Sequence, residues 1–217
     1  MSFRSVIGIR GEDKNPWERR APLSPTDVNT LVEQGGLEIV VESSSQRAFD
    51  ADSYAEAGAR TVSDLSGCTA ILGVKEIPPA KLIGGMTYLF FAHVIKGQPF
   101  NMPLLRTLLD RGCSLIDYEK VTNERGERLI FFGRHAGLAG MIDTLWALGQ
   151  RWARRGVTTP FAGIRRAYQY DDIDDAKCHF RQVGRRLARD GIPAELQPLT
   201  IGLTGYGNVS QGAQELL

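Results

Sequence analysis

Cysteine, long apolar stretches and a surplus of charge are all scarce in this sequence, and each shortage excludes a class of protein. The three cysteines, Cys68, Cys113 and Cys178, lie far apart without metal-ligand spacing, which predicts reduced thiols and no bound metal. No apolar stretch approaches the ~20 residues that span a bilayer, so we expect no membrane partner. The 26 basic and 25 acidic residues leave a formal charge of +1, which does not indicate nucleic acid as a partner.

The start of the sequence does not resemble a secretory signal peptide, because residues 1–14 turn polar and acidic at once. The expected location is therefore the cytoplasm. Hydrophobic residues make up 42% and charged residues 24% of the chain, which is typical of a globular protein and argues against disorder. A length of 217 residues allows one large domain or two small ones.

Apolar runs alternate with helix signals along the first part of the chain, which predicts an α/β domain. Strands are predicted at residues 5–9, 37–41, 69–74, 87–92 and 114–117, and helices at 25–35, 51–57 and 102–111. The third and fourth of these strands are apolar on both faces, which suits buried parallel strands. Residues 121–132 resemble a β-hairpin. The prediction is a Rossmann-like parallel sheet with flanking helices.

Two further helices are predicted after this sheet. A long helix should run from about His135 to Arg155. A second, amphipathic helix has an apolar face that extends from Ile173 to Leu187. The arginines of the second helix stand beside several aspartates, so its basic face is predicted to be solvated. We place the domain boundary after residue 156: residues 1–156 form a substrate-side domain, and 157–217 a connecting helix and an incomplete nicotinamide-binding domain.

A dinucleotide-binding turn is predicted near the end of the chain. A short apolar strand at residues 200–204 precedes a glycine-rich turn and a helix, the order that a dinucleotide fingerprint requires. Gly205 permits the tight turn, Gly207 lets the backbone approach a pyrophosphate, and the helix N-terminus supplies amide donors. Ser210 stands where a third glycine is usual, so an ordinary glycine turn is the alternative. The candidate cofactor-binding residues are Gly205, Gly207, Asn208, Val209 and Gly212.

The predicted nucleotide domain is truncated, because a strand–helix–strand unit takes about 30 residues and its ribose-binding acid follows the glycines by about 20. We therefore expect this stretch alone to bind no nucleotide and to be inactive.

Two chemically active residues follow apolar runs, at the place where open α/β sheets bind ligands. They are Lys75 and His93, whose side chains can both transfer protons near neutral pH. A solvated strand end is the alternative for Lys75, and a hydrogen-bonded core histidine is the alternative for His93. Arg20 could simply pair with Glu12 or Glu18.

Several strings match one family in the same order along nearly the whole chain. They are WERRAPLSP (17–25), LGVK (72–75), FAH (91–93), LIDYEK (115–120), FG with AGLAG (132–140) and TGYGNVSQGA (204–213). These strings resemble lysine-ketoglutarate reductases, the N-terminal half of bifunctional aminoadipic semialdehyde synthases. Saccharopine dehydrogenases, alanine dehydrogenases and the transhydrogenase α subunit share a looser version.

The resemblance implies a two-domain oxidoreductase of lysine metabolism that condenses lysine with 2-oxoglutarate and reduces the imine to saccharopine with NADPH or NADH. It implies a catalytic set of Lys75, His93, Glu76 and Glu119, in which the two acids tune the other pair. Arg20 matches the arginine that binds a substrate carboxylate, and Arg128 is a weaker match for a second one. A planar, bidentate guanidinium suits carboxylates.

Two other functions stay open. One is a different amino-acid oxidoreductase of the wider group, such as a saccharopine or alanine dehydrogenase, and the other is a non-catalytic module of the same fold. The partners expected are small molecules: lysine, 2-oxoglutarate and saccharopine. A homo-oligomer and a covalently linked saccharopine dehydrogenase domain are compatible with the resemblance.

Overall fold

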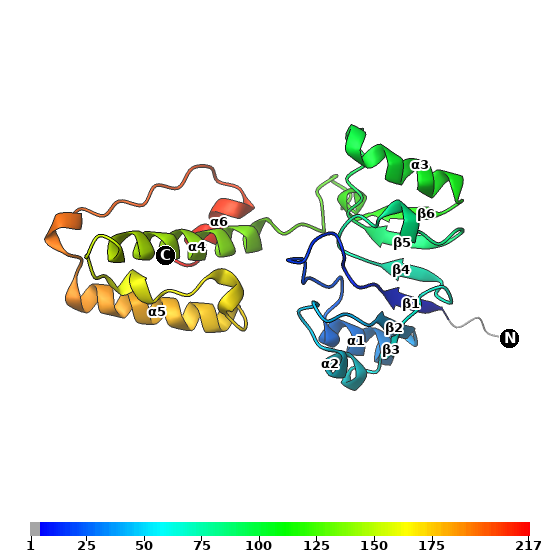
Figure 1. Ribbon diagram of the computed structural model, residues 1–217, viewed down its shortest axis with the longest axis horizontal. Coiled ribbons are helices and arrows are strands. Elements are labelled where there is room, and N and C mark those ends of the chain that lie inside the picture. Colours follow the sequence, from blue (N-terminus) through cyan, green and yellow to red (C-terminus); the bar gives the residue numbers. More distant parts are fainter. Residues whose placement is uncertain (1–4) are drawn as a thin grey trace. The chain divides into compact units, whose positions relative to one another are not determined.

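The computed structural model describes residues 5–217, which form two compact units that divide between Phe131 and Phe132. The first unit contains one six-stranded parallel sheet with the strand order β3-β2-β1-β4-β5-β6 (Figure 1). This order is the one found in doubly wound dinucleotide-binding folds. The predicted Rossmann-like parallel sheet is confirmed.

The strands are β1 (Val6–Ile9), β2 (Glu38–Glu42), β3 (Arg60–Val62), β4 (Ala70–Leu72), β5 (Thr87–Phe90) and β6 (Ser114–Asp117). The helices of the first unit are α1 (Pro25–Gly35), α2 (Ala51–Glu56) and α3 (Met102–Asp110), with single 3₁₀ turns at Pro79–Lys81, Pro99–Asn101 and Tyr118–Lys120. Strand β3 was not predicted, because it is a three-residue edge strand with two exposed residues and no apolar run.

Helix α1 shows why the predicted helices form where they do. The Ser24 hydroxyl accepts the Asp27 amide, and the Asp27 carboxylate accepts the Ser24 amide, which is a complete capping box. Gly36 ends the helix with a φ of 60°, in the left-handed region that glycine adopts without strain. The sequence signals at both ends therefore fix the length of α1.

Each face of the sheet has its own apolar core. On one face, α1 and α2 cover Ile9, Ile39 and Val41, with Val28 and Tyr54 from the helices buried among them. On the other face, α3 packs on a core that includes Phe90 and Tyr88; Figure 1 shows α3 beside β5 and β6. Since all strands are parallel, their carboxyl ends meet at one edge of the sheet.

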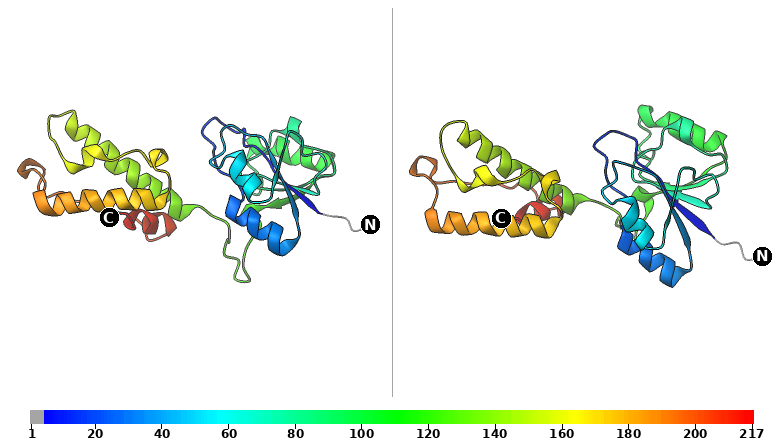
Figure 2. Two further views of the ribbon diagram at one scale, coloured as in Figure 1. Left: turned by 90° about the horizontal axis from the view of Figure 1, so that it is seen from below. Right: turned by 60° about the horizontal axis from the view of Figure 1, so that its bottom comes forward.

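The second unit is helical. It contains α4 (Gly133–Ala153), α5 (Ile173–Asp190) and α6 (Asn208–Gln214), with 3₁₀ turns at Pro160–Gly163, Ala167–Gln169 and Ala194–Leu196. The two long helices agree with the prediction, and they lie side by side (Figure 2). Leu138, Leu145 and Trp152 of α4 share a core with Phe180 and Val183 of α5.

The division between the units lies before α4, whereas the predicted boundary lay after residue 156. The difference has a physical reason: α4 buries its apolar face against α5 and α6 and contributes nothing to the two cores of the sheet. The sequence showed the helix but not the partner that its apolar face packs against.

Two predicted β elements take other forms. Residues 200–204 are not a strand, because a strand needs a hydrogen-bonded partner and none of the described residues pairs with them. Residues 121–132 form only one antiparallel bridge, between Thr122 and Arg128, in place of a full hairpin. Within residues 5–217, no helix is both long and apolar enough to cross a membrane.

Candidate active site

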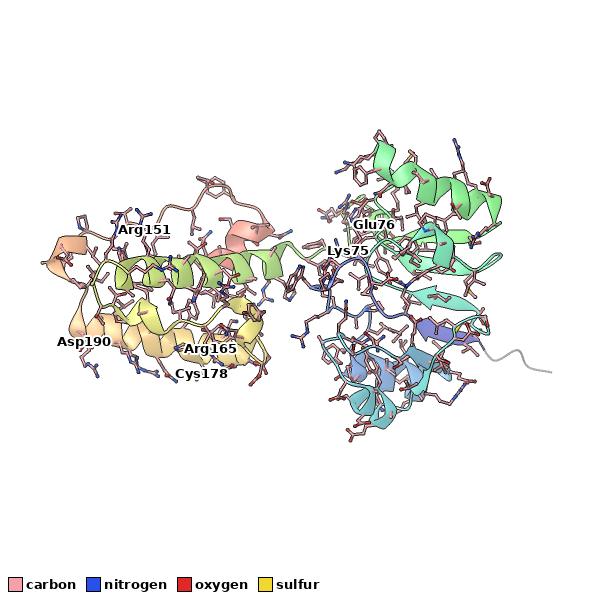
Figure 3. The ribbon with its side chains drawn as sticks, in the orientation of Figure 1. Lys75, Glu76, Arg151, Arg165, Cys178 and Asp190 are labelled. Carbon is pink, nitrogen blue, oxygen red and sulfur yellow. The ribbon has the colours of Figure 1, made fainter. Side chains whose placement is uncertain are left out.

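The carboxyl edge of the sheet brings together residues from four separate parts of the first unit. Lys75 and Glu76 lie on the loop after β4, where Figure 3 shows them next to each other. His93 lies on the loop after β5, and Glu119 in the 3₁₀ turn after β6. Arg20 lies on the loop between β1 and α1. Open α/β sheets bind ligands at this edge, so the arrangement is that of a candidate active site.

One cluster centres on the carboxylate of Glu119, whose side chain is only 7% exposed. One oxygen lies 3.5 Å from Nδ1 of His93, and the other accepts a hydrogen bond of 2.8 Å from Nη2 of Arg128. The turn that carries Glu119 is held by Asp117, which accepts the Glu119 amide at 2.9 Å. The carboxylate can therefore orient the imidazole through Nδ1 and leave Nε2 for proton transfer.

His93 has an unusual backbone, with a φ of 52°. A residue other than glycine in this left-handed region is strained by about 1–3 kcal/mol, and such strain collects at functional sites. The conformation is supported by the buried Asn101, whose side-chain amide donates to the carbonyl of His93 at 3.1 Å. The ring of Phe91 stacks on the imidazole at 6.1 Å between centroids. These contacts hold a half-exposed imidazole in one place.

A second cluster surrounds Lys75, which is half-buried. The carboxylate of Glu12 accepts the backbone amide of Lys75 at 3.0 Å. Hydrogen bonds from Arg20 lower the pKa of Glu18, and the nearby charge of Lys75 lowers it further. Lys75 therefore stands beside a carboxylate that is ionised at neutral pH.

The neighbour of Lys75, Glu76, belongs to the same edge. One oxygen of the Glu76 carboxylate lies 3.2 Å from Nζ of Lys14, and the other is buried without a hydrogen-bond partner among residues 5–217. A buried carboxylate oxygen without a donor is costly, and such an atom in a site commonly meets water or a ligand. Glu76 can therefore accept a further hydrogen bond at this place.

Arg20 is fixed by a bidentate pair with Glu18. Its Nε donates to Oε1 at 2.7 Å and its Nη2 donates to Oε2 at 2.6 Å. The pairing is the one expected as the alternative to a substrate contact, yet it differs from a loose surface pair because Glu18 is buried. The Arg20 side chain is 44% exposed, so an oriented guanidinium faces solvent at this edge.

The interior of the site is poorly solvated. Burial raises the pKa of Tyr118 to about 12, and the charge of Glu12 contributes to that rise. Burial also raises the pKa of Glu12 itself, against the lowering effect of the two amide hydrogen bonds that it accepts. Charges in such surroundings interact more strongly than they do in water.

Four residues of these clusters have supporting roles that the sequence did not indicate: Glu12, Lys14, Asn101 and Tyr118. Glu12 and Lys14 could have been noticed because they directly follow the first strand, which ends at the ligand-binding edge. Asn101 and Tyr118 gave no such signal, because their roles depend on how separate loops meet in the fold.

A cleft of about 570 Å³ also opens in the first unit, lined by Arg10, Asp13, Lys81 and residues 42–46 among others. Neither Lys75 nor His93 lines it. Glu12, which accepts the amide of Lys75, also borders this cleft, so the cleft adjoins the cluster around Lys75.

The glycine turn lies in the second unit. Gly205 has a φ of 84°, and a Cβ on Gly205 or Gly207 would meet no atom within 4 Å, so the turn is open on the side where those atoms would be. Gly207 is the N-cap of α6 and supplies no side-chain acceptor for the first amides of the helix, which begins at Asn208 and Val209. Those amides suit an anion such as a pyrophosphate.

Gly212 stands apart from the other glycines of this turn. It is buried, and a Cβ there would come 2.0 Å from the carbonyl oxygen of Arg134 in α4. Its lack of a side chain allows α6 and α4 to cross closely. The predicted cofactor residues therefore divide into the open turn of Gly205 and Gly207 and the α6 residues Asn208, Val209 and Gly212, which pack against α4. Among residues 5–217, no group of three His, Cys, Asp or Glu side chains could hold a metal ion.

Known proteins resemble the chain over its whole length. It is 41% identical over 216 residues to the mitochondrial α-aminoadipic semialdehyde synthase of Bos taurus, a match that covers 100% of this chain and 23% of that protein. It is 37% identical over 153 residues to the saccharopine dehydrogenase [NAD(+), L-lysine-forming] of Candida glabrata, which covers 67% of this chain and 41% of that one.

Among solved structures, an L-alanine dehydrogenase superposes with a TM-score of 0.56 at 26% identity, covering 70% of this chain and 42% of that chain. The model of the alanine dehydrogenase/PNT N-terminal domain matches residues 8–139, which include the end of β1, all of β2 to β6 and every residue of the two clusters. The chain belongs to the alanine dehydrogenase/PNT N-terminal domain family.

Proposed function

We propose that this chain is the N-terminal part of a longer oxidoreductase that condenses lysine with 2-oxoglutarate and reduces the resulting imine to saccharopine. The observation that carries the proposal is that Lys75 and His93 both lie at the carboxyl edge of the sheet, each with a carboxylate nearby. The likeness to aminoadipic semialdehyde synthases over all of this chain and 23% of their length supports the same reaction.

The reaction requires protons to move on and off a nitrogen and a carbinolamine oxygen. In the proposed mechanism, Lys75 and His93 transfer these protons, and Glu119 holds the imidazole for the purpose. Glu18 lies near Lys75, Glu76 follows Lys75 in the chain, and Glu119 lies 3.5 Å from His93, so each of the two basic groups has an acidic neighbour. General acid–base catalysis of this kind contributes typically 10²–10⁴-fold to the rate.

The substrates carry several carboxylates, which the two half-exposed arginines are proposed to bind. Arg20 and Arg128 are each held at one end by a buried glutamate, Glu18 and Glu119 respectively. A substrate carboxylate would bind each guanidinium beside the glutamate or in its place. Because both guanidinium groups are already oriented, less conformational entropy is lost when a carboxylate binds.

The nicotinamide cofactor would supply the hydride when bound, and we propose that the open turn of Gly205 and Gly207, with Asn208 and Val209 at the start of α6, holds its pyrophosphate. The left-handed turn at Gly205 and the uncapped start of α6 fit such a role. Gly212 supports that role indirectly, because it lets α6 approach α4. We propose NADPH or NADH as the hydride donor.

The test is steady-state kinetics on the complete enzyme. NADPH or NADH oxidation should require lysine and 2-oxoglutarate together, with saccharopine as the product identified by mass spectrometry. A second candidate, supported by the superposition on an L-alanine dehydrogenase, is reduction of pyruvate with ammonia. Oxidation that depends on pyruvate and ammonium, without lysine, would replace the first proposal with the second.

Three properties of the complete enzyme stay proposals. Self-association and a fused saccharopine dehydrogenase part are compatible with the relatives. A cytoplasmic location was expected, whereas the similar protein of Bos taurus is named as mitochondrial.

A further inference from the structure

Glu12 lies directly after β1 and touches backbone amides instead of facing solvent. Its side chain is only 2% exposed. Its Oε1 accepts the amide of Val74 at 2.7 Å, and its Oε2 accepts the amide of Lys75 at 3.0 Å. Burying a carboxylate costs free energy unless hydrogen bonds compensate for the lost water. The two hydrogen bonds from the amides of Val74 and Lys75 therefore indicate the role of Glu12.

The end of β1 explains why a side chain is needed here. The ladder between β1 and β4 ends where the amide of Arg10 donates to the carbonyl of Leu72 at 3.0 Å. Beyond that point, β1 offers no further backbone acceptor to the loop after β4. The carboxylate of Glu12 takes the place of the missing strand for the two amides of Val74 and Lys75.

The surroundings of Glu12 leave its carboxylate little freedom to move. Nη1 of Arg10 lies 3.7 Å from Oε2 on one side. A Cβ on Gly73 would come 3.3 Å from Oε1 and 3.0 Å from Cδ of Arg10, so the glycine makes room for both side chains. The buried ring of Tyr118 lies near enough for the charge of Glu12 to raise its pKa. The confined carboxylate of Glu12 consequently holds the loop that carries Lys75.

We infer that Glu12 is a positioning residue for Lys75. It holds the backbone of the loop after β4 and so sets the direction in which the Lys75 side chain leaves that loop. The inference deepens the proposed function and rests on it for its kinetic consequence, whereas the hold on the loop can be measured without activity.

The first experiment uses amide hydrogen exchange by NMR on the 217-residue chain, with Glu12→Gln and Glu12→Ala. Glutamine keeps one carbonyl acceptor, so one of the Val74 and Lys75 amides should exchange at least tenfold faster, and alanine should release both. The matched control is Asp27→Ala, which breaks the capping box of α1 in the same unit. It should leave both amides protected. Unchanged protection of both amides in Glu12→Gln would overturn the inference.

The second experiment measures kcat, the Michaelis constants and the pH profile in the complete enzyme. A misplacement of about 1 Å can cost about 10²-fold in rate, so kcat should fall by that order in Glu12→Ala and by less in Glu12→Gln. The pH profile of kcat should change as well, whereas the Michaelis constant for the nucleotide should not change. If Glu12→Ala fails to fold, Glu12→Gln still gives both measurements.

Two outcomes separate this inference from the proposed function. Freed amides with an unchanged kcat and pH profile would show that Glu12 is structural only, and would overturn the inference. An unmodified enzyme that forms no saccharopine would overturn the proposed function, and the amide exchange would then decide alone whether Glu12 holds Lys75.

Discussion

The two units of this chain place their charged residues in opposite ways. In the first unit, buried or half-buried acids and bases meet at the edge where parallel strands end, and Glu12, Glu18 and Glu119 are all buried. In the second unit, charged side chains lie on the exposed faces of helices, and the buried residues are almost entirely apolar. The first arrangement costs free energy to maintain, whereas the second stabilises the fold.

The two units also use glycine differently. At the sheet edge, Gly73 makes room for the polar side chains of Arg10 and Glu12. In the helical unit, Gly137 and Gly212 bring two helix backbones together. The comparison teaches that the first unit places polar and charged groups at the edge of its sheet. The described part of the second unit instead carries the open glycine turn on closely packed helices.

The largest effect is expected from removing the amine of Lys75. Lys75→Met should lower kcat of the complete enzyme by roughly 10²–10⁴-fold, because general acid–base catalysis contributes that much. The melting temperature should hardly change, since a half-buried side chain on a loop contributes little to packing. Steady-state kinetics and thermal unfolding of the same sample check the two parts. Near-normal turnover would leave Lys75 as a solvated strand end.

Replacing the planar guanidinium of Arg20 by an ammonium should give the next largest effect on the kinetics. Arg20→Lys keeps the charge but loses bidentate geometry, and a hydrogen bond to a charged group contributes about 1.5–3 kcal/mol. The Michaelis constant of one dicarboxylic substrate should rise roughly tenfold to a hundredfold, with that of the nucleotide unchanged. Arg19→Lys, at the exposed neighbouring position, is the control. If neither substrate constant moves, Arg20 serves only its pair with Glu18.

A methyl group between α4 and α6 should destabilise the second unit alone. A Cβ on Gly137 would come 1.9 Å from the carbonyl oxygen of Val209, so Gly137→Ala should cost about 1–3 kcal/mol through overpacking. The matched control is Gly140→Ala, where a Cβ meets no atom within 4 Å. That change should stabilise the helix by about 0.5–1 kcal/mol.

Denaturant unfolding followed by tryptophan fluorescence distinguishes these variants, because Trp152 is buried in the second unit and Trp17 is 84% exposed in the first. Equal stability of the Gly137 and Gly140 variants would show that the crossing of α4 and α6 is looser than described.

The smallest effect concerns acid stability and has opposite signs in the two units. Hydrogen bonds from Arg134 and Lys177 lower the pKa of Glu215 to about 2. Its contribution to stability is therefore present above pH 4.5 and lost as the pH falls toward 2. Burial raises the pKa of Glu12, so its contribution is full below pH 4.5 and lost as the pH rises through the folded value.

Unfolding measured from pH 2 to 7 checks this contrast. Glu215→Gln should reduce the fall in the free energy of unfolding of the second unit as the pH drops. Glu12→Gln should reduce a pH dependence of the opposite sign in the free energy of unfolding of the first unit. Slopes of the same sign in both units would contradict the contrast between a paired exposed acid and a buried one.

Much of the fold could be predicted because its signals are local. Apolar runs fixed β4, β5 and β6, and capping residues fixed α1. The edge position of Lys75 and His93 followed from the parallel sheet, since each stands directly after an apolar run. The strand expected at residues 200–204 failed, because pairing depends on a partner that local sequence does not reveal.

The supporting contacts of the candidate site could not be predicted, because each joins loops that meet only in the folded chain. The left-handed backbone of His93 rests on Asn101, eight residues away on another element. The hold of Glu12 on Lys75 spans 63 residues. Gly212 lies two residues beyond the usual third glycine of a nucleotide fingerprint, and a Cβ there would meet the backbone of Arg134 in α4.

The most direct test of the proposed function is a crystal structure of the complete enzyme with bound saccharopine. The account predicts that the secondary amine of saccharopine lies within hydrogen-bonding distance of Lys75 or His93, and that its carboxylates contact Arg20 and Arg128. Saccharopine bound away from Lys75 and His93, for example in the cleft beside Arg10 and residues 42–46, would contradict the account.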